Sequence, residues 1–230
     1  YINHSIDKKI TFYQKNIIAP IKPTTNKAII VFFVYKDIVD NDTKKTLYLF
    51  IKTNLKFNKE TTIYIFTNQD LNVSEKDCNR LKITHLKYLD EKTMTNRVIF
   101  NYIIINKFNI YEKIIFFDSD LIPLDYYQFE DDFDIGLTYN QNYLAENKFA
   151  INAGFLIINY RDIDKVNNFN RAYLDSYKSI LKNEKIIMTH FNLEKLPSEW
   201  YGDQLVFHFM KLNFPKDEFK TYEDIEYQKN

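Results

Sequence analysis

The sequence predicts an α/β protein in which helices cover a mostly parallel central sheet. Short apolar runs alternate with segments whose apolar residues recur at helical spacing, in the order β-α-β-α-β-α-β. Most strand candidates are continuously apolar, as expected when both faces of a parallel sheet are covered. The 230 residues, 45% of them hydrophobic, suffice for one domain with a large core.

The first half of the chain supplies the alternating elements. Strands are expected at residues 28–34, 62–67, 83–88 and 114–117. Helices are expected at residues 42–55, 74–81 and 95–108, the first with Asp42 as its N-cap. In the third helix the predicted buried stripe leaves two asparagines, Asn101 and Asn106, on the solvent side.

The second half is expected to complete the same domain. Strands are predicted at residues 134–138 and 149–159, helices at 166–181 and 202–212, and a loop or mixed segment at 183–197. Residues 1–26 are polar, and we expect an irregular N-terminal extension that packs on a single domain spanning residues 27–230. Because the chain begins with Tyr1 rather than Met, we also expect it to be an excised or processed piece.

Charge and cysteine content exclude several classes of protein. The 31 basic and 31 acidic residues balance, so neither a nucleic-acid footprint nor a polybasic membrane patch is expected. A single cysteine, Cys78, excludes an internal disulfide framework. The apolar runs are too short to span a bilayer and no signal peptide is visible, which is compatible with a cytoplasmic location but leaves localisation open.

Two carboxylates follow the fourth predicted strand, at Asp118 and Asp120. Side chains two positions apart on an extended segment point the same way, so the two are expected to converge. Ionised carboxylates beside a buried strand need water, a cation or hydrogen-bond donors, and a divalent cation bound there could bridge to a phosphate. A solvated turn after the strand explains the same residues equally well at this point.

Glycine is scarce, and each occurrence lies in a polar segment that suggests a site. The three residues are Gly136, Gly154 and Gly202. We expect each of them to meet a need for positive φ or for close backbone approach, the alternative being ordinary turns or strand packing.

Three segments in order carry a family resemblance. They are Asp118-Ser119-Asp120, the run that begins Asn152-Ala153-Gly154, and Trp200-Tyr201-Gly202-Asp203-Gln204. Over residues 27–212 the chain resembles the GT-A glycosyltransferases, most of all family 8 and its glycogenin-like relatives. The resemblance implies a Rossmann-like GT-A fold, a nucleotide-sugar donor such as a UDP-sugar, Mn²⁺ or Mg²⁺, and retention of the anomeric configuration by a hexosyltransferase.

The resemblance also implies roles for individual residues. Asp118 and Asp120 match the metal-binding aspartates, and a cation there would stabilise the departing nucleotide diphosphate. Asn152, Ala153 and Gly154 match the segment that approaches the donor sugar or the acceptor. Asp203 and Gln204 match the pair beside the sugar ring, where Asp203 would bind hydroxyls and Gln204 would lie near the anomeric carbon. Alternatively, Asn152 closes a turn and Asp203 caps the following helix.

Two further residues are candidate donor ligands. Related enzymes carry a basic residue on the helix that precedes the metal-binding strand, where this chain has Arg97, although the spacing is longer and a solvated arginine fits equally well. Tyr35 follows the first strand, where the family holds the uracil and ribose, and an aromatic ring there suits stacking with a base.

The chain departs from the family at the third metal ligand. No His-Gly-Lys-Pro-Trp-like segment follows, and the remaining candidates, His190 and His208, are more typical of structural histidines. The acidic run at residues 130–132 is expected to be a solvated loop. The sequence leaves the acceptor open between glycan, protein and lipid, because Trp200 and Tyr201 suit an acceptor groove and a core equally.

Two other functions compete with a glycosyltransferase. Haloacid dehalogenase-like phosphohydrolases also place two aspartates after a buried strand, but their motif lies near the N-terminus and is followed by Thr or Val rather than by Leu121. A non-catalytic carbohydrate-binding protein on a transferase fold is the third reading, which the two aspartates disfavour and the missing histidine favours.

Overall fold

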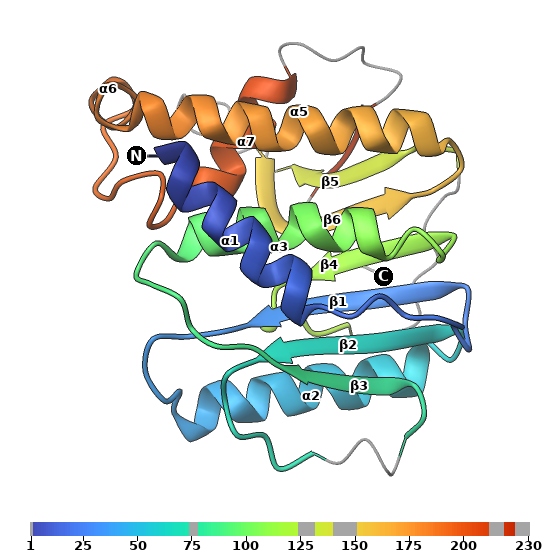
Figure 1. Cartoon of the computed structure of the whole chain (residues 1–230). Helices are drawn as coiled ribbons and strands as arrows, with labels where there is room; N and C mark the ends of the chain where they lie inside the picture. Colours follow the sequence, from blue (N-terminus) through green and yellow to red (C-terminus); the bar gives the residue numbers. More distant parts are fainter. Residues whose placement is uncertain (1, 74–77, 124–131, 140–150, 212–218, 224–230) are drawn as a thin grey trace.

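A seven-stranded sheet forms the centre of the computed structural model, which describes residues 2–73, 78–123, 132–139, 151–211 and 219–223 (Figure 1). The strand order is β3-β2-β1-β4-β6-β5-β7. The strands are β1 (Lys27–Phe33), β2 (Thr61–Thr67), β3 (Leu81–His85), β4 (Lys113–Phe117), β5 (Ile135–Tyr139), β6 (Ile151–Asn159) and β7 (Phe219–Glu223).

The sheet is mostly parallel. β1 pairs in parallel with β2 and β4, β2 with β3, and β5 with β7. Among these strands β6 alone runs the opposite way, antiparallel to both β4 and β5, as the reversed arrow in Figure 1 shows. The predicted α/β class with a mostly parallel central sheet is therefore confirmed.

Helices cover both faces of this sheet. They are α1 (Ile2–Asn16), α2 (Asn41–Phe57), α3 (Thr93–Lys107), α5 (Ile163–Lys182), α6 (Glu184–His190) and α7 (Gly202–Lys211). The buried residues of α1, α3, α5 and α7 form one core with one face of the sheet, whereas those of α2 form a second core with the other face. This two-sided cover explains why β1 and β4 are continuously apolar.

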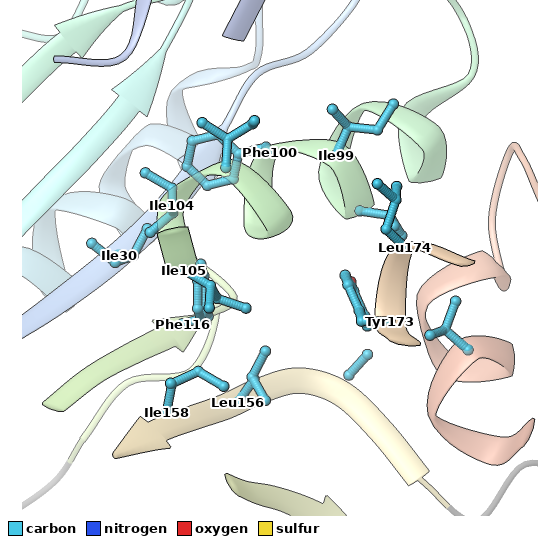
Figure 2. Close-up of a cluster of buried hydrophobic side chains, with 14 of the residues drawn as sticks. Ile30, Ile99, Phe100, Ile104, Ile105, Phe116, Leu156, Ile158, Tyr173 and Leu174 are labelled. Atoms are coloured by element: carbon cyan, nitrogen blue, oxygen red, sulfur yellow. The ribbon is translucent and has the colours of Figure 1, made fainter. Parts of the chain in front are cut away.

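Alternation along the strands divides the side chains between the two cores. In β1, Ile30 belongs to the core under α3, while Ile29 and Val31 face α2. In β4, Phe116 and Ile115 divide in the same way. Figure 2 shows the α3 side, where side chains of α3 and α5 meet those of β1, β4 and β6.

The N-terminal segment differs from the expectation of irregular structure. Residues 2–16 form α1, which buries Ile6 and Tyr13 in the larger core and thus packs on the sheet domain as expected. Its apolar positions are few, but they share one face, and this short stripe was masked by the surrounding polar residues. The buried Lys9 pairs with Asp90 at 2.5 Å, which ties α1 to the segment before α3.

Several boundaries and one burial expectation were wrong. α2 begins after Asp40, whose side chain accepts a hydrogen bond from Thr43 N, so Asp40 and not Asp42 is the N-cap. The third strand begins at Leu81, and the described end of the expected helix at residues 74–81 is a turn that leads into it. Asn101 is only 5% exposed and not on the solvent side as expected. It lines a cavity of about 10 Å³ together with Arg97 and Asp118.

The second half adds two elements that were not expected, the short helix α6 and the edge strand β7. The acidic run at residues 130–132 and the first residues of the strand expected at 149–159 lie almost wholly outside the described residues.

None of the helices in the described part of the chain combines the length and hydropathy needed to cross a membrane.

Candidate active site

The candidate site lies where β1, β2 and β4 end and the antiparallel β6 begins. The carboxyl ends of parallel strands share one edge of a sheet, and this edge is where open α/β sheets bind ligands. Because β6 runs the other way, its first residues reach the same edge. The backbone confirms this, since Asp118 N donates a 2.8 Å hydrogen bond to the carbonyl oxygen of Gly154.

Arg97 of α3 connects three of the elements at this edge. Its Nη2 lies 2.6 Å from Oδ1 of Asp118, and its Nε lies 3.4 Å from Oδ2 of Asp203 on α7. The same Nη2 donates a 3.0 Å hydrogen bond to the carbonyl oxygen of Ala153 on β6. Four of the predicted site residues therefore meet at Arg97, and Gly154 joins them through its bond with Asp118. Arg97 is not the solvated helix arginine that was the alternative.

Burial makes these charges depend on one another. The side chains of Arg97 and Asp203 are 18% and 5% exposed, whereas that of Asp118 is 37% exposed. Burial alone would lower the pKa of Arg97, but the carboxylates of Asp118 and Asp203 raise it above its ordinary value, so the guanidinium stays charged. Burial raises the pKa of Asp203, and the charge of Arg97 opposes that shift.

Asp203 has both carboxylate oxygens engaged within the protein. Its Oδ2 faces Arg97, and its Oδ1 accepts a 2.8 Å hydrogen bond from the backbone N–H of Gln204 in the first turn of α7. The helix-terminal role and the site role therefore coexist in one side chain. Gln204 itself is half-buried.

The Asp118-Ser119-Asp120 segment is a turn and not an extended strand. β4 ends at Phe117, and Leu121 N donates a 3.2 Å hydrogen bond back to the carbonyl oxygen of Asp118. The expectation that the two carboxylates converge through strand alternation is therefore wrong in its premise. Asp118 turns to Arg97, while Asp120 is exposed to solvent.

Tyr35 joins the two aspartates from the end of β1. Burial raises the pKa of its hydroxyl, a hydrogen bond with the Ser119 side chain lowers it, and the charges of Asp118 and Asp120 raise it further. Both carboxylates therefore lie close enough to act on this one hydroxyl. The ring packs edge-on against Phe33 at a centroid distance of 4.9 Å and stays 40% exposed, so part of it remains available to a ligand.

Two amides missed by the sequence analysis, Asn68 and Gln69, hold the loop that carries Tyr35. They follow β2 directly, and their side chains bond the backbone of residues 35–39. Polar amides at the carboxyl end of a parallel strand were a signal that could have revealed them.

Gly202 is the glycine whose close approach is evident. A Cβ there would lie 2.4 Å from the carbonyl oxygen of Pro197 and 2.8 Å from the ring of Tyr177. None of the glycines in the described residues has positive φ, so that part of the expectation was wrong. The tight contact places the start of α7, and with it Asp203, against the end of α5.

Replacing Gly202 with Ala is expected to lower the free energy of unfolding by about 1–3 kcal/mol, as overpacking does. Helix propensity alone predicts the opposite, a gain of up to about 1 kcal/mol. The sign of the change in the free energy of unfolding, measured with urea, therefore decides between the two effects. A stabilised variant would contradict the steric contact.

The remaining candidates are Asn152 and two histidines. Asn152 pairs through its backbone with Thr138 in the sheet, and its side chain lies outside the described parts. His190 and His208 both pack edge-on against Phe191. Across the described ranges, no three His, Cys, Asp or Glu side chains gather as a metal site. A larger groove of about 630 Å³ lies between α5, α6 and α7, and none of the predicted site residues lines it.

The chain was also compared with known proteins. No protein-family model and no curated protein matches the sequence. The apo form of the glycosyltransferase GlyE of Streptococcus pneumoniae TIGR4 is similar in structure, with 17% identity, a TM-score of 0.49, and coverage of 87% of this chain and 46% of that one. The apo structure of the bifunctional glycosyltransferase WbbM has 11% identity, a TM-score of 0.49, and coverage of 90% and 40%. The chain thus spans less than half the length of either protein.

Proposed function

We propose that this domain is a metal-dependent GT-A glycosyltransferase of the family 8 type, which transfers a hexose from a UDP-sugar with retention. The observation that carries the proposal is the linkage of Asp118, Asp203 and the start of β6 by the half-buried Arg97. Exposed Asp120 and the partly exposed ring of Tyr35 border the same edge. In this proposal the carboxylates would hold a cation, the guanidinium of Arg97 would contact a diphosphate, and the ring of Tyr35 would stack on a base.

The carboxylates suit a hard divalent cation. Oxygen ligands are those that Mg²⁺ and Mn²⁺ prefer, and Mg²⁺ is commonly held by one or two carboxylates together with substrate phosphates and water. In the described structure Arg97 contacts Oδ1 of Asp118, so Oδ2 of Asp118 and the exposed carboxylate of Asp120 are the oxygens that would supply such ligands. When bound, the cation would neutralise the negative charge that develops on the departing diphosphate.

The protein residues divide the remaining work. Arg97 would orient the diphosphate, because its guanidinium is held in place by two carboxylates before any ligand arrives. Asp203 would act mainly through Arg97, since both of its oxygens are already engaged. Gln204, half-buried in the first turn of α7, would face the sugar.

The nucleoside would lie against Tyr35. A partly exposed tyrosine ring offers a flat apolar face for a base. Uracil is the base that the resemblance to family 8 suggests, so a UDP-sugar is the donor to test first.

The arrangement of Asp118 disfavours the phosphohydrolase alternative. It requires a carboxylate that is free to attack phosphorus, whereas Asp118 is paired with Arg97 at 2.6 Å. Phosphate release from a simple phosphomonoester would favour that alternative. A non-catalytic protein would bind UDP without hydrolysing any UDP-sugar.

The test is a thermal-shift measurement with Mn²⁺, UDP and both together. We expect the pair to raise the melting temperature more than the sum of the separate shifts, because each ligand completes the site of the other. The same measurement on Asp120→Ala is expected to show no extra shift from the pair. A wild-type protein without a combined shift, or an equal shift in the variant, would overturn the proposal.

A further inference from the structure

Asn68 makes two hydrogen bonds with the backbone of a single residue, Tyr35. Its Oδ1 accepts from Tyr35 N at 3.0 Å, and its Nδ2 donates to the carbonyl oxygen of Tyr35 at 2.6 Å. A side-chain amide that engages both backbone groups of a residue replaces the two ladder bonds of a strand pair. Asn68, one residue past the end of β2, therefore ties down the backbone two residues past the end of β1.

Gln69 continues the same support along the loop. Its Oε1 accepts from Val39 N at 3.0 Å, and its Nε2 donates to the carbonyl oxygen of Asp37 and to Oδ1 of Asn68, both at 3.0 Å. Its backbone N–H donates to Oγ1 of Thr67 at 2.9 Å, and the residue is only 4% exposed. The two adjacent amides thus anchor residues 35–39 to the end of β2.

We infer that Asn68 is a positioning residue for nucleotide binding, which acts by fixing the backbone of Tyr35. The inference rests on the proposed function. It assigns a role to a residue outside the three motifs at residues 118–120, 152–154 and 203–204. Tyr35 presents its ring at the ligand edge, and its hydroxyl interacts with Ser119 between the two aspartates. Holding its backbone keeps the ring and the cation site in one fixed arrangement before the ligand arrives.

Preorganisation is the physical basis of this role. Ordering a loop at the moment of binding costs conformational entropy, and a loop that is already anchored avoids that cost. Asn68 is half-buried at the rim, so its truncation removes the two bonds to Tyr35 and the one from Gln69 without opening the core. Gln69 is the less suitable residue to vary, since its loss would leave buried polar groups without partners.

The experiment compares wild type with Asn68→Ala by calorimetric titration with two probes in the presence of Mn²⁺, UDP and inorganic pyrophosphate. We expect the affinity for UDP to fall about tenfold, as the loss of two hydrogen bonds that preorganise a site allows. The affinity for pyrophosphate is expected to stay unchanged, because that probe does not reach the base site. Amide exchange at Tyr35 and Val39 is expected to accelerate in the variant.

A control variant, and distinct results for the positioning role and for the proposed function, allow the two claims to be tested separately. Asn26→Ala removes an exposed amide that bonds Glu112 at 3.0 Å, and it should leave both affinities unchanged. Equal UDP affinity in wild type and Asn68→Ala would overturn the positioning role alone, as would an equal loss for UDP and pyrophosphate. A wild-type protein that binds neither probe would overturn the proposed function itself.

Discussion

Replacing Arg97 with Met is expected to lower the free energy of unfolding by about 3–5 kcal/mol, the cost of removing one partner of a buried ion pair. The variant leaves the carboxylate of Asp203, which is 5% exposed, without its cation. It also removes the hydrogen bond to the carbonyl oxygen of Ala153. Urea unfolding followed by circular dichroism measures the change.

Two comparisons separate the buried pair from a general loss of charge. Lys45→Met removes a pair with Asp42 in which both side chains are at least 75% exposed, and it should have a far smaller effect. Adding Asp203→Asn to Arg97→Met should recover part of the loss, since the stranded charge is then gone. A single variant no less stable than Lys45→Met would show that the pair does not hold the site together.

Replacing Asp120 with Asn is expected to slow the hydrolysis of a UDP-sugar in the presence of Mn²⁺ by about 10²–10³-fold, as loss of one electrostatic contact to developing charge does. The carboxylate is exposed, so the variant should keep the melting temperature of the wild type. Release of UDP from a panel of UDP- and GDP-sugars measures the rate without an acceptor.

Asp7→Asn is the matched control for this substitution. Asp7 is an exposed carboxylate on α1, so the variant should retain the full rate. Equal rates in Asp120→Asn and Asp7→Asn would remove Asp120 from the catalytic centre. A loss of rate accompanied by a fall in melting temperature would point to a structural role for Asp120 instead.

Local patterns predicted the architecture well where burial is strong. β1 and β4 are buried on both faces, so a continuous apolar run was enough to locate them within a residue or two. The amphipathic pattern of α5 predicted that helix within three residues at its start and one at its end. Where polar residues dominate, as in α1, the few apolar positions carried too weak a signal, and burial of the helix depends on the sheet beneath it.

The site was predictable as a set of residues but not as an arrangement. Asp118, Gly154 and Asp203 stand in an ordered motif, which local sequence contains. The link among them is Arg97, whose partners lie on a strand and a helix far along the chain, so only the packing of α3 against β4 and α7 brings them together. The same holds for Asn68, because it reaches its partner Tyr35 only through the pairing of β1 with β2.

The sequence by itself determined the α/β class, the mostly parallel sheet and most of the residues at the candidate site, because hydrophobic periodicity and short motifs are local. The tertiary structure alone decided the reversed direction of β6, the turn that separates Asp118 from Asp120 and the pairing of Arg97 with two carboxylates. These features depend on contacts between distant segments. Those contacts exist only once the sheet and its helices have assembled and buried their apolar side chains.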